Sequence, residues 1–187
     1  MRLFVALEIP SAARENLAEL VNALRAVSPQ SRWVRPENLH VTLKFIGEVA
    51  ETKLAAIRTA LAQVRSERHV RLDFRGLGFF PNEKHPRVLW AGIEASPNLK
   101  TLAAEIEEAA ETLGIPREQE PFSPHLTLAR FEPPRLSDQL RVAVQEHAGH
   151  EFGSLLTNQF HLIESKLKPS GAEYTTVESF SFAAAEA

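Results

Sequence analysis

The chain has 187 residues, of which 44% are hydrophobic and 24% charged, with a net charge of −3 at pH 7. This length suits one domain, or one domain built of two lobes, and the composition is ordinary for a globular protein. Cysteine is absent, which excludes disulfides, thiolate nucleophiles and zinc–thiolate sites. There is no transmembrane-length apolar run, and residues 2–8 alternate like a strand rather than a signal peptide, so a cytoplasmic location is expected.

Positive charge is concentrated in one stretch of the chain. Residues 25–90 contain 12 Lys or Arg and 6 Asp or Glu, a local net charge of +6. Such a region could contact phosphates, although solvated helix and strand faces are the favoured explanation on charge alone. The candidates are Arg32, Arg35, Lys44, Arg65, Arg68, Arg71, Arg75, Lys84 and Arg87.

Hydrophobic periodicity predicts helices and strands in mixed order. Strands are expected over residues 2–9, 33–34, 39–46, 70–80, 87–94, 125–131, 150–153, 156–165 and 173–182. Helices are expected over residues 10–27, 51–65, 97–113 and 137–147, and residues 183–187 are expected to fray. This order favours an α+β fold with antiparallel sheets over a doubly wound parallel sheet. The predicted unit is a single domain over residues 1–187.

One motif, His-x-Thr-Leu with an apolar x, occurs twice. The copies are His40-Val41-Thr42-Leu43 and His125-Leu126-Thr127-Leu128. Each stands at the start of a predicted strand, after a turn that contains proline. One copy alone would be ordinary strand sequence, but two copies at nearly half-chain spacing favour a functional reading.

Strand alternation predicts which side chains share a face. His40, Thr42 and Lys44 should lie together, with Phe45 on the opposite, core face. Arg130 is out of phase with His125, so reaching the same face would require a bulge near Ala129.

The sequence resembles the 2H phosphoesterase superfamily, and most closely its RNA 2′,3′-cyclic phosphodiesterases, also described as 2′-5′ RNA ligases. The resemblance spans almost the whole chain and includes residues 32–48, 122–130 and 164–174 around the two motifs. It implies two pseudo-symmetric lobes around a central cleft, each an antiparallel sheet with helices on its outer face. The N- and C-terminal segments would share one lobe.

The resemblance also implies roles for the motif residues. His40 would be the general acid for the 3′ oxygen and His125 the general base for water, since two imidazoles can hold opposite protonation states near neutral pH. Motif symmetry alone does not decide which is which. Thr42 and Thr127 would donate hydroxyl hydrogen bonds to phosphate oxygens, and Arg130 and Lys44 are further phosphate-binding candidates.

RNA binding predicts an aromatic side chain that stacks on a base. Phe122 and Tyr174 are the favoured candidates, ahead of Phe79 and Phe80. We expect no metal and no cofactor, because the seven histidines show no familiar ligand spacing. The expected partner is RNA with a 2′,3′-cyclic phosphate or 2′-phosphate end, with no membrane and a monomeric protein.

Three other functions remain open at this stage. The same residues run in reverse would make a 2′-5′ RNA ligase. The substrate could instead be another small cyclic phosphate, such as an ADP-ribose cyclic phosphate. A non-catalytic module that binds RNA ends is less favoured, because binding alone does not require two titratable groups.

Overall fold

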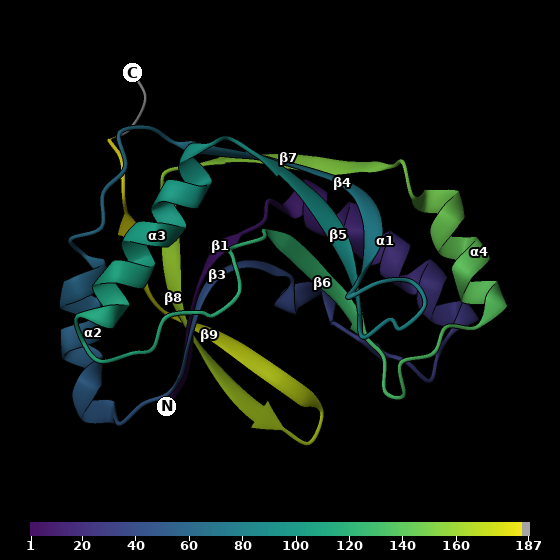
Figure 1. The fold of residues 1–187 in the computed structure, drawn as a ribbon, viewed down its shortest axis with the longest axis horizontal. Helices are drawn as coiled ribbons and strands as arrows, with labels where there is room; N and C mark the ends of the chain where they lie inside the picture. The colour runs from purple at the N-terminus through teal and green to yellow at the C-terminus, as the bar shows by residue number, and fades with distance from the viewer. Residues whose placement is uncertain (185–187) are drawn as a thin grey trace.

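Two antiparallel sheets and the helices that cover them make up the computed structural model, which describes residues 1–184 (Figure 1). The expected fraying of residues 185–187 lies outside the described residues. Sheet A has the order β3 (His40–Glu48), β1 (Arg2–Glu8), β8 (Gln159–Lys168), β9 (Gly171–Ser181). Sheet B has the order β2 (Arg32–Trp33), β6 (His125–Arg130), β5 (Val88–Ala95), β4 (Val70–Phe80), β7 (Glu151–Thr157).

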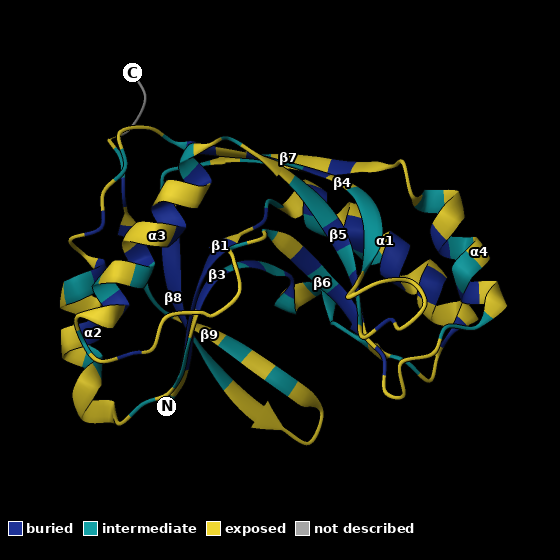
Figure 2. Ribbon diagram, viewed as in Figure 1, coloured by how far each residue is buried: buried dark blue, intermediate teal, exposed yellow. Residues whose placement is uncertain are grey.

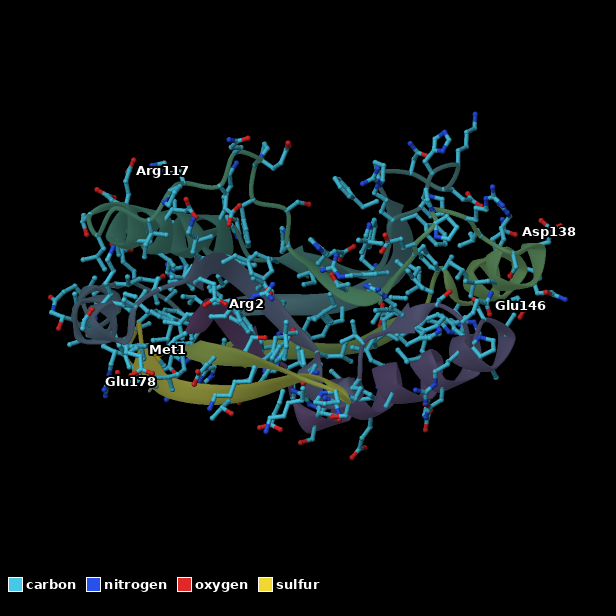
Figure 3. The ribbon with its side chains drawn as sticks, turned by 90° about the horizontal axis from the view of Figure 1, so that it is seen from below. Met1, Arg2, Arg117, Asp138, Glu146 and Glu178 are labelled. Atoms are coloured by element: carbon cyan, nitrogen blue, oxygen red, sulfur yellow. The ribbon has the colours of Figure 1, made fainter. Side chains whose placement is uncertain are left out.

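Each sheet has its own pair of helices. α2 (Leu54–Leu61) contacts α3 (Asn98–Glu111), which packs on β3 of sheet A. α1 (Ser11–Val27) packs on β7 and on α4 (Asp138–His147), which contacts β4 of sheet B. Short 3-10 turns lie at Pro36–Asn38 and Glu51–Lys53. Helices α2 and α3 lie at one end of the molecule and α4 lies at the other (Figure 1). Asp138 and Glu146 of α4 are accordingly far from Met1 and from Glu178 of β9 (Figure 3).

The chain crosses between the sheets more than once, so the lobes are not sequence halves. Sheet A takes two strands from each end of the chain, and α1 follows a sheet A strand but packs on sheet B. The predicted α+β fold with two antiparallel lobes is confirmed, including the shared lobe of the two terminal segments. Leaving out the two-residue β2, the order β3-β1-β8-β9 corresponds to β6-β5-β4-β7, so each motif strand occupies the same place in its sheet.

Apolar spacing explains why these elements form and pack. On α1 the buried residues recur three or four positions apart and form one stripe: Ala13, Leu17, Leu20, Val21 and Leu24. One continuous hydrophobic core joins residues of both sheets with all four helices. Figure 2 shows buried strand interiors, whereas the tip of the β8–β9 hairpin is exposed. No helix within residues 1–184 is both long and apolar enough to span a membrane.

Candidate active site

The two motif strands meet. β3 begins at His40 and β6 begins at His125, and the two strands contact each other although they belong to different sheets. Within each strand, the first His and the following Thr lie on one face, while Val41 and Leu126 between them are fully buried on the other. The predicted pairing of an imidazole and a hydroxyl on each strand is present twice.

A β-bulge interrupts each motif strand at the same place. In sheet A, Ala6 pairs with Thr42 but Val5 pairs with Lys44, so Leu43 is the extra residue. In sheet B, Trp90 pairs with Thr127 but Leu89 pairs with Ala129, so Leu128 is extra. A one-residue insertion reverses the facing of every later side chain. Both strands therefore bury two consecutive residues and then return to the open face.

The bulge overturns the predicted place of Lys44. Lys44 is 2% exposed and lies on the core side of β3, not beside His40. Its ammonium donates to the Pro116 carbonyl at 2.7 Å and lies 2.7 Å from Glu107 Oε1 and 3.8 Å from Glu118 Oε1. The assignment of Lys44 to phosphate binding was wrong, because strict alternation took no account of the bulge.

The same shift moves Phe45 onto the open face. Phe45 is 59% exposed, and its ring lies 6.2 Å from that of Phe4. The prediction that it lies in the core was therefore wrong. Arg130 holds the matching position on β6, where the bulge needed to bring it to the His125 face is present. Arg130 is exposed and pairs in register with Arg32 of β2 and Val88 of β5.

Both imidazoles are held in the same way. His40 Nδ1 lies 3.2 Å from the Asn38 carbonyl, and His125 Nδ1 lies 2.8 Å from the Ser123 carbonyl, two residues upstream in each case. A carbonyl oxygen only accepts, so Nδ1 carries the proton in both rings. Each neutral imidazole thus presents Nε2 as an acceptor, and each imidazolium presents Nε2–H as a donor.

The turn before His40 is fixed from two sides. Arg14 on α1 donates through Nη1 to the Pro36 carbonyl at 2.6 Å and to the Leu39 carbonyl at 3.3 Å. From the other side, Arg35 and Asn38 both donate to the Ala172 carbonyl on β9, at 2.6 Å and 2.9 Å. Helix α1, which packs on sheet B, and the β8–β9 hairpin of sheet A therefore fix the position of the Asn38 carbonyl, which orients His40.

Burial lowers the pKa of His40 below its ordinary value. The Asn38 carbonyl and the Glu8 carboxylate, which is its partner in register on β1, act in the opposite direction, while Arg14 and His161 add to the lowering. Burial also lowers the pKa of His161, whose Nδ1 lies 2.8 Å from Ser179 Oγ. An anion at the site would raise the pKa of His40, because it favours the charged imidazolium.

An aromatic cluster surrounds His40. Its ring lies 5.8 Å from that of Tyr174 on β9 and 6.4 Å from that of Phe4 on β1, and the latter two rings are 4.9 Å apart. Tyr174 is thus beside the catalytic candidate. Phe122 is half-buried and packs against the main core, a position that disfavours a stacking role.

Sequence reasoning missed Phe45, Phe4 and Glu8 as residues of this face. The signal for Phe45 was available: aligning the two motifs places it opposite Arg130, for which a bulge was already needed.

Much of the predicted basic region is neutralised locally. Arg71 pairs with Asp73 at 3.5 Å, and Arg75 pairs with Glu151 and with Glu94. Within residues 1–184, no group of three or more His, Asp or Glu side chains is arranged to hold a metal ion.

The contacting motif strands carry two imidazoles and two hydroxyls, groups that are suited to acid–base chemistry on a phosphate ester. The model of the family described as "LigT like Phosphoesterase" matches residues 7–90 and 93–174. The chain belongs to this family.

Curated relatives cover nearly the whole chain. A protein of Archaeoglobus fulgidus is 36% identical over 180 residues, covering 96% of this chain and 99% of its own. One of Thermus thermophilus is 39% identical over 193 residues, covering 97% and 90%. Both are named RNA 2′,3′-cyclic phosphodiesterase.

Solved structures share the fold. A Thermus thermophilus crystal structure matches with a TM-score of 0.76 at 35% identity, covering 97% of this chain and 98% of that one. Escherichia coli LigT complexed with 3′-AMP matches with a TM-score of 0.75 at 27% identity, covering 97% of both chains.

Proposed function

We propose that this chain is a hydrolase that opens RNA 2′,3′-cyclic phosphate ends to 2′-phosphates. The observation that carries the proposal is the pair of contacting strands on which an identically held imidazole is followed by a threonine on the same face. The names of the curated relatives support the substrate class. Binding an RNA end would need donors but not two equivalent acid–base groups, which favours catalysis over a binding module.

In the proposed reaction, His125 takes a proton from water through Nε2 as the water oxygen attacks phosphorus. The bond between phosphorus and the 3′ oxygen breaks, and the His40 imidazolium donates its Nε2 proton to that oxygen. The 2′ ester remains, so the product is a 2′-phosphate. Burial lowers the pKa of His40 in the free protein, whereas the bound phosphate anion and Glu8 would act in the opposite direction and favour the protonated imidazole.

Three side chains would stabilise the phosphate. Thr42 and Thr127 donate their hydroxyl hydrogens, one from each sheet, to non-bridging oxygens. Arg130 would add a planar fork of donors that matches two phosphate oxygens. Lys44 has no part in this, since its ammonium is committed to Glu107.

The sheet A aromatics would bind the base of the cyclic nucleotide. Phe45 is the exposed ring on the His40 face, and Tyr174 closes the His40 side. Both would favour a single-stranded end whose base is free to stack. We propose that one chain is the working unit, because it supplies both motifs, that the reaction needs no cofactor, and that the enzyme acts in the cytoplasm in RNA processing.

The test uses an oligonucleotide with a 2′,3′-cyclic phosphate end, incubated with wild type, His40→Ala and His125→Ala in the presence of chelator. Wild type should produce a 2′-phosphate end, and each variant should lose on the order of 10²- to 10⁴-fold in turnover. Near-wild-type turnover by either variant would contradict the mechanism. Tight binding without turnover of any cyclic phosphate would establish the binding module instead.

A further inference from the structure

A third histidine lies on the open face of sheet A, outside both motifs. His161 of β8 pairs in register with Ser179 of β9 on one side and with Ala6 of β1 on the other. Ala6 in turn pairs with Thr42 of β3, the threonine of the first motif. Residues opposite one another on neighbouring strands project to the same side of a sheet. These four residues therefore form one row across all four strands, on the face that carries His40.

Both ring nitrogens of His161 have polar partners. Nδ1 lies 2.8 Å from Ser179 Oγ, and Nε2 lies 4.0 Å from Glu8 Oε2. Because a carboxylate only accepts hydrogen bonds, the neutral ring that suits both partners carries its proton on Nε2 and accepts from the Ser179 hydroxyl at Nδ1. His161 is only 9% exposed, so solvent has little access to the ring between these two side chains.

Glu8 stands between two imidazoles. It pairs in register with His40 across β1 and β3, and its carboxylate contacts His161 on the neighbouring strand β8. Within residues 1–184, His161 is the one basic side chain with a nitrogen within 4.0 Å of a Glu8 carboxylate oxygen. The Glu8 side chain is 53% exposed, so without this contact it would be free to turn away into solvent.

The position of the Glu8 charge matters for the protonation of His40. Burial lowers the pKa of His40, and Arg14 adds to this lowering, whereas the Asn38 carbonyl and the Glu8 carboxylate oppose it. A protonated His161 would also lower the pKa of His40. Burial lowers the pKa of His161 itself and keeps its ring neutral at neutral pH. His161 can therefore hold Glu8 without placing a competing positive charge near His40.

We infer that His161 is a positioning residue of the proposed reaction, which together with Ser179 holds the Glu8 carboxylate beside the His40 imidazole. The inference rests on the proposed function and adds to it a residue that neither motif contains. His161 acts on no reacting atom directly. It acts through Glu8, whose negative charge favours the protonated His40 that donates to the 3′ oxygen.

The first test measures the pKa of His40 by NMR titration of its imidazole, which requires no turnover. Glu8→Gln should lower this pKa, because the amide keeps the side-chain shape and removes the negative charge. His161→Ala should lower it by a smaller amount, because Glu8 loses its partner. His161→Gln, whose side-chain N–H can still donate to Glu8, should restore most of the wild-type pKa.

The double variant Glu8→Gln/His161→Ala separates positioning from packing. Because His161 acts through Glu8, the double variant should have the same His40 pKa as Glu8→Gln alone. His147→Ala is the matched control, since this ring is also partly buried but is bonded to the Ala143 carbonyl on α4, which packs with sheet B. Its loss should leave the pKa of His40 unchanged.

Turnover gives a second measurement. In the pH profile of kcat/KM on a 2′,3′-cyclic mononucleotide, one limb should move to lower pH in both Glu8→Gln and His161→Ala, because His40 loses its proton more readily. At about pH 7.5, kcat/KM should decrease on the order of tenfold in Glu8→Gln and by a smaller factor in His161→Ala. Ser179→Ala should change the profile in the same direction, and less.

An unchanged or raised His40 pKa in His161→Ala would overturn the inference, as would a double variant whose His40 pKa lies below that of Glu8→Gln. An unchanged pH profile of kcat/KM in His161→Ala would refute its role in the reaction. The proposed function fails in a different way, if the wild type opens no cyclic phosphate while the His40 pKa responds to both substitutions as expected. The contact with Glu8 would then stand, and its catalytic role would be refuted.

Discussion

Strands β3 and β6 share the pattern His-x-Thr-Leu-x-x and the same bulge, yet they differ in the two residues that follow the bulge. On β3 these are Lys44, which turns inward to an ion pair, and Phe45, which is exposed. On β6 they are Ala129, which is fully buried, and Arg130, which is exposed. The same β-bulge in both strands thus accompanies equivalent positions for His40 and His125, the catalytic candidates. Under the proposed function, the divergent positions would specialise one side of the site for a base and the other for a phosphate.

The two threonines test whether the halves are equivalent. Thr42→Val and Thr127→Val keep the side-chain shape and remove only the hydroxyl. Each should lower kcat on the order of 10²- to 10³-fold, the usual cost of removing one fixed donor to developing charge. Single-turnover rates on a cyclic phosphate end would measure both. A large loss in one variant and none in the other would break the equivalence.

Arg130 and Phe45 test the divergence. Arg130→Ala should lower kcat/KM by about 10²-fold, because a charge-assisted contact with the phosphate is lost. Phe45→Ala should raise KM by about tenfold with a smaller change in kcat, because stacking is lost in ground and transition states alike.

Steady-state kinetics on a cyclic mononucleotide separate the two effects, and Phe45→Trp is the matched control that retains a ring. If Phe45→Ala lowers kcat as much as Arg130→Ala does, the two positions are not specialised as described.

Lys44 is the inward-facing residue that follows the bulge in β3. Its substitution tests the comparison through the free energy of unfolding. Lys44→Met should destabilise the fold by about 3 kcal/mol, because Glu107 loses the charge that compensates its partial burial. Denaturant unfolding measures this, with the exposed Lys53→Met as control. Should Lys44→Met instead abolish turnover at unchanged stability, its side chain would act on the phosphate after all.

A smaller effect on the stability of the fold is expected when the pH is changed. Burial lowers the folded-state pKa of His40 and of His161, so the unfolded chain binds more protons below its ordinary histidine pKa of about 6.5. The contribution of these two histidines to the free energy of unfolding is therefore fully present above that pH, and it is lost as the pH falls toward their folded-state pKa values.

The melting temperature should decrease on acidification from about pH 7.5 to 5.5, and His161→Gln should make this decrease shallower. His85→Gln, in an exposed loop, is the control. If the melting temperature of His161→Gln depends on pH as steeply as that of wild type, the contribution assigned to His161 is refuted.

Sequence reasoning predicted the α+β class, the main elements and the His–Thr pairing, because period-two burial and the repeated motif are local signals. It failed at Lys44 and Phe45 because a bulge is a pairing feature. Whether Leu43 is an extra residue depends on how β1 pairs with β3, which the sequence of β3 does not show.

The proposed roles of His40 and His125 as acid and base on one phosphate are tested most directly with a cyclic substrate whose 3′ oxygen is replaced by sulfur, since a thiolate leaves without needing a proton. Single-turnover hydrolysis of this substrate should restore His40→Ala by about 10²-fold or more relative to the oxygen substrate, and should leave His125→Ala impaired. Rescue of His125→Ala alone would exchange the two roles, and rescue of neither variant would contradict the acid–base pair.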